Sequence, residues 1–203
     1  MDEKGLNQPA KKHSAEEFLA AERRNPARNE YVNGKILAKS GTGRWQNIIA
    51  SNIAVAVGSR LSGNKSEMYV NGMRVRLRDS IISYPDVVIV SGEPGFTDAN
   101  QDVLLNPTVV VDIYSSATNF ADKALKIESY LGLESIRECL LVKVDEMRIE
   151  QYSRQNAKQW TYKIHNERED VISLDSVNCK ISLAEVYAQI KFRHAELSST
   201  AVN

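Results

Sequence analysis

Four segments of the chain space their hydrophobic residues as an amphipathic helix does, at intervals of three or four positions. They are residues 14–24, 44–61, 119–133 and 183–197. The first begins with Ser14 and carries Glu17 three positions later, which is a capping-box signature. The last would align Leu183, Val186, Ile190 and Leu197 along one stripe. The pattern therefore predicts a helix at each of these places.

Between the helices, the pattern changes to the period of a β-strand. Asn33-Gly34 separates two short apolar runs, and this dipeptide is the strongest local signal for a hairpin. Residues 73–78 alternate apolar side chains with three arginines, so one strand face is buried and the other basic. Further strands are predicted at residues 83–90, 107–115, 138–144, 147–155, 158–165 and 171–182, with a loop over 91–106. The order of elements predicts an α/β fold with a central mixed sheet flanked by helices.

Composition fits one soluble domain. The chain has 203 residues, 42% of them hydrophobic, and no apolar run approaches the roughly 18 residues of a membrane span. Polar composition predicts flexible tails at residues 1–12 and 197–203, which leaves a single domain over 13–196. The two cysteines, Cys139 and Cys179, have no metal-binding spacing and are typical of a reduced, cytoplasmic protein.

Charge and motifs exclude several function classes. Lys and Arg total 26, and Asp and Glu also total 26, so the formal net charge is zero. Dedicated non-specific nucleic-acid binders are usually strongly basic, which argues against that class. The sequence has no GxSxG, GxxxxGK[ST] or HExxH motif, which argues against a serine hydrolase, a P-loop NTPase and a zinc peptidase.

Two carboxylates stand in unusually apolar surroundings. Asp86 lies within the run SYPDVVIV and Asp112 within PTVVVDIYS, both typical of strands in a parallel sheet. Carboxylates are rarely buried without a partner, so the pair suggests a shared hard cation, Mg²⁺ or Mn²⁺. Lys123 and Lys126 follow on the next predicted helix, where an ammonium could stabilise a phosphoryl transition state. Taken singly, each Asp could instead cap a turn and each Lys could lie on a solvated helix face.

These segments resemble the PD-(D/E)xK nuclease superfamily, and within it a family of small bacterial single-domain restriction-endonuclease-like proteins. The resemblance covers residues 14–165 and rests on SAEEFLA, NEYVNGKI, SYPDVVIV, NPTVVVDIYSSAT and DKALKIESY followed by SIRECLLV. It implies a restriction-endonuclease-like fold, a DNA substrate and a metal-dependent endonuclease activity. A homodimer is also expected, because two sites cut two strands and cyclic dimers are the commonest oligomers.

The resemblance also implies residue roles. Asp86 and Asp112 would be the metal carboxylates, with the backbone carbonyl of Ile113 completing the coordination. The superfamily's lysine normally stands where this chain has a tyrosine, and Lys126 matches the displaced position found in the family. Glu30 matches an acidic residue of the first hairpin that binds or orients a second ion.

Two positions depart from the family pattern. Asp112 stands where the family usually has glutamate, and Gln46 stands where it often has histidine. Aspartate is one methylene shorter, and glutamine is not an acid or base near neutral pH. The alternative function is therefore a weakened or inactive nuclease-fold module that binds nucleic acid or assembles with a partner.

Arg74, Arg76 and Arg78 form the best candidate for contact with a polyanion, together with Lys123. Three arginines on one strand face could lie along a phosphate backbone. The alternative interpretation is an exposed sheet face whose arginines pair with Asp or Glu of the same protein.

Overall fold

The computed structural model describes residues 12–39, 43–61 and 65–192. Apart from Lys12, the predicted tails and the predicted domain boundary at residue 196 lie outside these ranges. The helices are α1 (Ala15–Glu22), α2 (Arg44–Leu61), α3 (Phe120–Gly132) and α4 (Leu183–Val186). The predicted capping box of α1 is present, since the Ser14 and Glu17 side chains each accept the other residue's backbone N–H.

The largest sheet has six strands in the order β11-β10-β9-β8-β6-β3. Their bounds are β3 (Ser66–Val70), β6 (Val87–Ser91), β8 (Val109–Tyr114), β9 (Glu138–Lys143), β10 (Ile149–Asn156) and β11 (Gln159–His165). β8 and β9 run parallel, whereas the other neighbours are antiparallel. The predicted central mixed sheet, and with it the α/β class, is confirmed.

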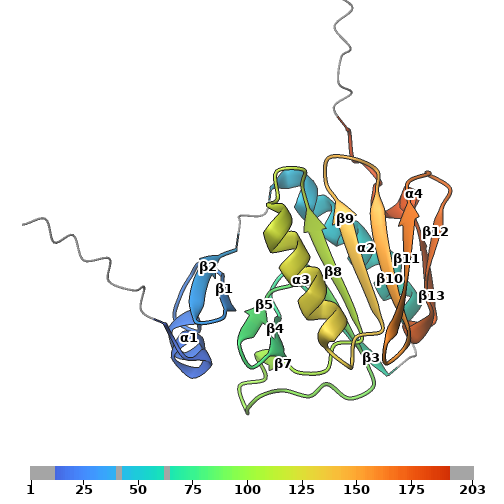
Figure 1. Cartoon of the computed structure of the whole chain (residues 1–203). Helices are drawn as coiled ribbons and strands as arrows, with labels where there is room; N and C mark the ends of the chain where they lie inside the picture. Colours follow the sequence, from blue (N-terminus) through green and yellow to red (C-terminus); the bar gives the residue numbers. More distant parts are fainter. Residues whose placement is uncertain (1–11, 40–42, 62–64, 193–203) are drawn as a thin grey trace, which may run out of the picture.

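Two smaller sheets adjoin the central one (Figure 1). The first has the order β2-β1-β5-β4-β7, with bounds β1 (Asn29–Val32), β2 (Lys35–Ala38), β4 (Arg74–Arg78), β5 (Ile81–Ser83) and β7 (Val103–Leu104). The second pairs β12 (Val171–Leu174) with β13 (Cys179–Ser182) around a 3₁₀ turn, Asp175–Val177. The predicted hairpin joins β1 to β2, with φ of 51° at Asn33 and 88° at Gly34, as a type I′ turn requires.

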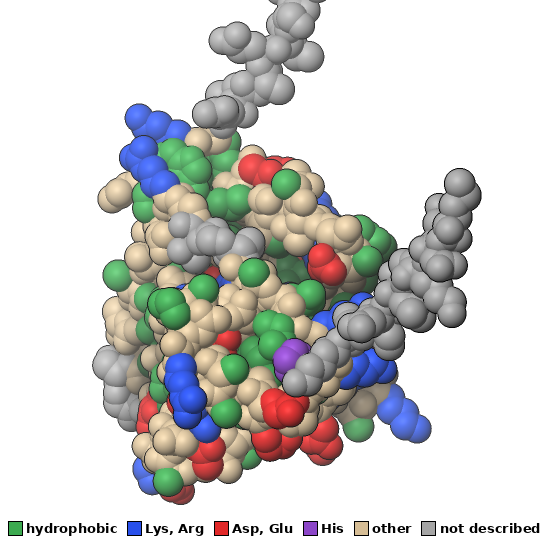
Figure 2. Space-filling model, turned by 90° about the vertical axis from the view of Figure 1, so that its left-hand side faces the viewer, with side chains coloured by type: hydrophobic (Ala, Val, Ile, Leu, Met, Phe, Trp, Pro, Cys, Tyr) green, Lys and Arg blue, Asp and Glu red, His purple; other side chains and the backbone are tan. Residues whose placement is uncertain are grey.

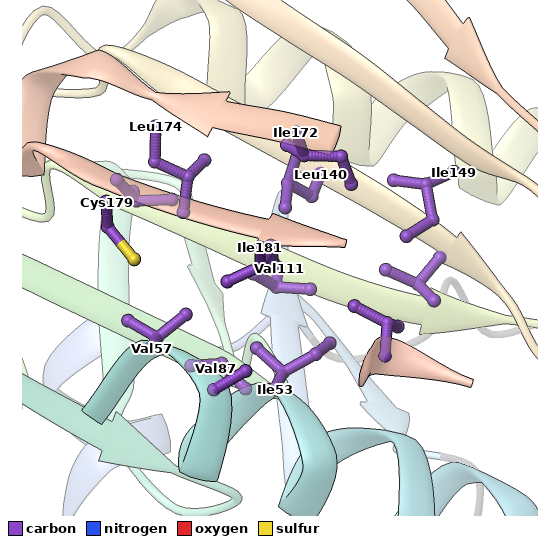
Figure 3. Close-up of a cluster of buried hydrophobic side chains, with 14 of the residues drawn as sticks. Ile53, Val57, Val87, Val111, Leu140, Ile149, Ile172, Leu174, Cys179 and Ile181 are labelled. Carbon is purple, nitrogen blue, oxygen red and sulfur yellow. The ribbon is translucent and has the colours of Figure 1, made fainter. Parts of the chain in front are cut away.

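The inner strands β6, β8 and β9 are buried on both faces, because their successive side chains point to opposite sides and each side is covered. Val87 and Val111 point into a core shared with α2, β12, β13 and α4 (Figure 3). Val88 and Val110 point into a second core with α3 and β4. In Figure 1, α3 accordingly crosses one face of the sheet and α2 lies behind the other.

The two apolar runs suggest parallel strands, which holds for β8 beside β9 and is wrong for β6, since β6 is antiparallel to both of its neighbours. An all-apolar strand signals burial on both faces, and here the helices on each side provide that burial without a parallel neighbour at β6. Asp86 directly precedes β6, and Asp112 lies near the end of β8. Because the two strands run in opposite directions, the start of one lies beside the end of the other, and the Asp86 N–H donates to the Val111 carbonyl over 2.9 Å.

The last predicted helix is also wrong in length. α4 ends at Val186, and the described chain then turns, with Gln189 at a positive φ of 64°. Leu183 and Val186 are buried against the central core, whereas a left-handed residue at 189 cannot continue a right-handed helix. Residues from 193 onward, including Leu197 of the predicted stripe, lie outside the described ranges.

The surface carries both signs of charge, as a formal net charge of zero suggests. Figure 2 shows a face on which acidic, basic and hydrophobic side chains are interspersed. Cys139 and Cys179 are both buried and free. In the part of the chain that the structure describes, no helix is long and apolar enough to span a membrane.

Candidate active site

One pocket collects most of the residues singled out in the sequence. It encloses about 540 Å³ where the first hairpin, α2, β8 and α3 meet. The predicted residues that line it are Glu30, Gln46, Asp86, Asp112, Ile113, Lys123 and Lys126. Arg74, Arg76 and Arg78 are not among its lining residues.

Asp86 is 1% exposed, and both of its carboxylate oxygens accept hydrogen bonds. Its Oδ2 accepts the backbone N–H of Ile113 over 2.7 Å, which fixes the carboxylate against the end of β8. Its Oδ1 lies 3.1 Å from both the Lys39 Nζ and the Gln46 Nε2, which donate to it. Burial, followed by the neighbouring charge of Asp112, raises the pKa of Asp86.

Asp112 is also buried, and its negative charge is compensated by a lysine and a hydroxyl donor. Its Oδ2 accepts the hydroxyl of Tyr130 over 2.8 Å and lies 3.2 Å from the Lys126 Nζ. Burial opposes ionisation of this carboxyl, but the charges of Lys126 and Lys39, together with hydrogen bonds from Tyr130 and Lys126, lower its pKa. The two aspartates are thus driven apart in acidity, a feature common in catalytic carboxylate pairs.

Lys126 joins Asp112 to the first hairpin. Its Nζ lies 3.0 Å from the Glu30 Oε1, which also accepts the Ser83 hydroxyl over 2.6 Å. Burial disfavours the charged ammonium, yet the carboxylates of Asp112 and Glu30 raise the pKa of Lys126. This lysine is therefore held charged inside the pocket and does not belong to a solvated helix face.

Lys123 lies one helical turn before Lys126 and faces β10. Its Nζ lies 3.0 Å and 3.1 Å from the two carboxylate oxygens of Glu150, and 4.0 Å from the centre of the Tyr114 ring. Burial disfavours the charged form of Glu150, but the hydrogen bonds from Lys123 and Tyr114 lower its pKa. Lys123 lines the pocket, and its contact with Glu150 holds its ammonium against β10.

Two further residues, Tyr130 and Lys39, contact the carboxylates and are absent from the prediction. Tyr130 follows Lys126 by four positions on α3, so helical spacing could have indicated that both face the same strand. Lys39 comes directly after β2, and no local pattern marks it as different from other lysines. Only the folding of the hairpin over the end of β8 brings it to Asp86.

The three arginines take up contacts within the protein. Arg74 lies 2.7 Å from an Asp102 carboxylate oxygen, and Arg78 lies 3.3 Å from one of Glu128. Arg76 is partly buried, and its Nε has no hydrogen-bond partner among the described residues. Arg74 and Arg78 thus form ion pairs within the protein, as the alternative interpretation expects. Contact between these arginines and nucleic acid stays a prediction.

Three comparisons identify what this architecture is similar to. Residues 15–185 match the profile of the Uma2 family, described as "Putative restriction endonuclease". The chain belongs to this family. Two uncharacterized proteins of Synechocystis are similar, one 27% identical over 148 residues (72% of this chain, 84% of the relative), the other 23% identical over 185 residues (91% and 96%).

The fold of this Uma2 member also has a solved counterpart. A crystal structure of a putative nuclease belonging to DUF820 from Anabaena variabilis superposes with a TM-score of 0.71. The match covers 88% of this chain and 99% of the other at 15% sequence identity, so it shows the fold. The predicted restriction-endonuclease-like family and fold are confirmed.

Proposed function

We propose that this Uma2 protein is a metal-dependent endonuclease that hydrolyses DNA phosphodiester bonds with a PD-(D/E)xK type of site. The observation that carries the proposal is the meeting of Asp86, Asp112 and Lys126 in one pocket of a restriction-endonuclease-like fold. Phosphodiester hydrolysis needs acidic oxygen donors and a positive charge close together, and here two buried carboxylates meet a partly buried ammonium.

The donor set fits Mg²⁺ or Mn²⁺. Asp86, Asp112 and the backbone carbonyl of Ile113 would hold the ion, and all three offer oxygen. Among the described residues, no group of three or more His, Cys, Asp and Glu side chains has a metal-binding arrangement. Two carboxylates suffice for Mg²⁺, since it usually keeps several waters and adds substrate phosphates. When bound, the ion would supply an activated water and neutralise charge on the phosphate.

Contacts made by Lys126, Tyr130 and Gln46 position the two carboxylates. Lys126 holds its positive charge between Asp112 and Glu30, where it would face the negative charge of the phosphate. Tyr130 fixes one oxygen of Asp112 by donating to it, so that the other oxygen is oriented for binding. Gln46 donates an amide hydrogen to Asp86 and would orient that carboxylate.

Cleavage of supercoiled plasmid DNA with Mg²⁺ or Mn²⁺ tests the proposal. Asp112→Asn should abolish cleavage, while Asp79→Asn, which alters an exposed aspartate outside the pocket, should cleave as the unchanged protein does. Calorimetry should show that Mn²⁺ binds at least roughly tenfold more weakly to Asp112→Asn. Replacing a residue that only supports a metal ligand already weakens binding by about that factor, and Asp112 would be a ligand itself. Full cleavage by Asp112→Asn would refute the assignment.

The second candidate function is a nuclease-fold module without turnover, and Gln46 is the observation that favours it. Its amide reaches the Asp86 Oδ1, yet it offers no proton transfer near neutral pH. Such a module would still bind DNA after Asp86→Asn and would lose binding when Arg74 and Arg78 are replaced. Gel-shift titrations separate the two functions, and light scattering tests the predicted homodimer.

A further inference from the structure

Lys39 lies deeper in the site than lysines usually do. Its side chain is only 9% exposed, and its Nζ is 3.1 Å from the Asp86 Oδ1. The same ammonium donates to the backbone carbonyl of Tyr84. A charged lysine so enclosed is uncommon unless it is paired, and here the partner is a proposed metal ligand.

The lone pairs of Asp86 show what this pairing means for an incoming cation. An ionised carboxylate offers about four lone-pair positions, two on each oxygen. Lys39 and Gln46 use both positions on Oδ1, and the N–H of Ile113 uses one on Oδ2. A divalent ion on Asp86 would have to share this carboxylate with an ammonium a few ångströms away, and their like charges repel.

The charges of the pocket lead to the same conclusion. The buried carboxylates of Glu30, Asp86 and Asp112 are balanced in part by the ammonium groups of Lys39 and Lys126. Lys126 bridges Glu30 and Asp112, so Lys39 alone provides the positive charge at Asp86 among the ion pairs of the described residues. Lys39 thus supplies the counter-charge that a divalent ion would bring to this carboxylate.

We propose that Lys39 is an internal counter-cation of Asp86 that competes with the divalent ion, so that metal binding displaces its ammonium. The inference rests on the proposed metal site and describes how that site is regulated. Lys39 follows directly after β2, an exposed strand at the edge of its sheet. Its long, flexible stem lets the ammonium move away without a change in the strand.

Calorimetric titration of Mn²⁺ into protein stripped with EDTA tests the competition. The variants are Lys39→Gln, which keeps a hydrogen-bond donor for the Tyr84 carbonyl, and Lys39→Met, which keeps the length of the stem. Lys35→Gln is the matched control, because Lys35 is an exposed lysine of the same hairpin. Both Lys39 variants should bind Mn²⁺ roughly tenfold to a hundredfold more tightly, the equivalent of one charged hydrogen bond. Lys35→Gln should bind as the unchanged protein does.

Thermal unfolding provides a second measurement that needs no activity. Without metal, the Lys39 variants should melt at a lower temperature than the unchanged protein, since Asp86 loses its counter-charge. Saturating Mn²⁺ should raise their melting temperature more than it raises that of Lys35→Gln. Circular dichroism at the starting temperature checks that each variant is folded.

The outcomes separate this inference from the proposed function. Equal or weaker Mn²⁺ binding by folded Lys39 variants would overturn the competition and leave the metal site standing. Binding of Mn²⁺ by none of the proteins would overturn the metal site, and the inference with it. Tighter binding by both Lys39 variants, together with the larger thermal shift, would establish both.

Discussion

The hydroxyl of Tyr130 offers a direct measure of how strongly the fold holds the pocket carboxylates. Tyr130→Phe removes one buried oxygen and leaves the ring in place, so no large cavity forms. The lost hydrogen bond, 2.8 Å long, runs to the ionised Asp112. Because hydrogen bonds to charged groups contribute about 1.5–3 kcal/mol, we expect the free energy of unfolding to fall by about 2 kcal/mol.

Tyr31→Phe is the matched control for this change. Tyr31 is 6% exposed, and its hydroxyl donates over 2.9 Å to the neutral backbone carbonyl of His13. A neutral hydrogen bond contributes about 0.5–1.5 kcal/mol, so the control should cost about half as much. Urea unfolding at neutral pH measures both losses, provided that the variants share the slope of the unchanged protein. Equal losses in the two variants would refute the reasoning that Asp112 is ionised and depends on Tyr130.

Three further predictions concern the fold outside the pocket. Ser14→Ala should lower the free energy of unfolding by about 1 kcal/mol, because the helix loses its capping side chain, and Ser14→Asp should restore it in urea titrations. Gly34→Ala should cost roughly 1–2 kcal/mol in the same assay, since φ is 88° there, and no loss would contradict the turn type. Burial lowers the pKa of His165 below its usual 6.5. Neutral His165 therefore stabilises the folded state above pH 6.5, and this stabilisation is lost as the pH falls through the lowered pKa. His165→Gln should flatten this decline, as unfolding midpoints at several pH values would reveal.

Local chemistry explains why much of the fold is predictable from sequence. The cap of α1 needs only Ser14 and Glu17, and the first turn needs only Asn33 and Gly34. In both cases the groups that interact lie within four positions of each other. The helix predicted over residues 119–133 is likewise found as α3, Phe120–Gly132, with Asn119 as its N-cap.

The last helix shows where local pattern is insufficient. Apolar spacing continues beyond Val186, yet the described chain turns at Gln189. Helix propensity is a weak preference, and the contacts of Leu183 and Val186 with the core determine the path instead. The direction of β6 relative to β8 is a similar case, because an apolar run predicts burial on two faces and not the orientation of its neighbour.

The sequence by itself determined the α/β class and most element positions, and it marked Asp86, Asp112 and Lys126 as candidate site residues. It could do so because periodicity, capping and carboxylates in apolar runs are local signals. Only the tertiary structure decided that these groups meet, since an antiparallel pairing sets the start of β6 beside the end of β8. It also decided the place of Lys39, which pairs with a carboxylate 47 positions away. Contacts between residues so distant in the chain depend on how the sheets and helices pack, and no local pattern records that packing.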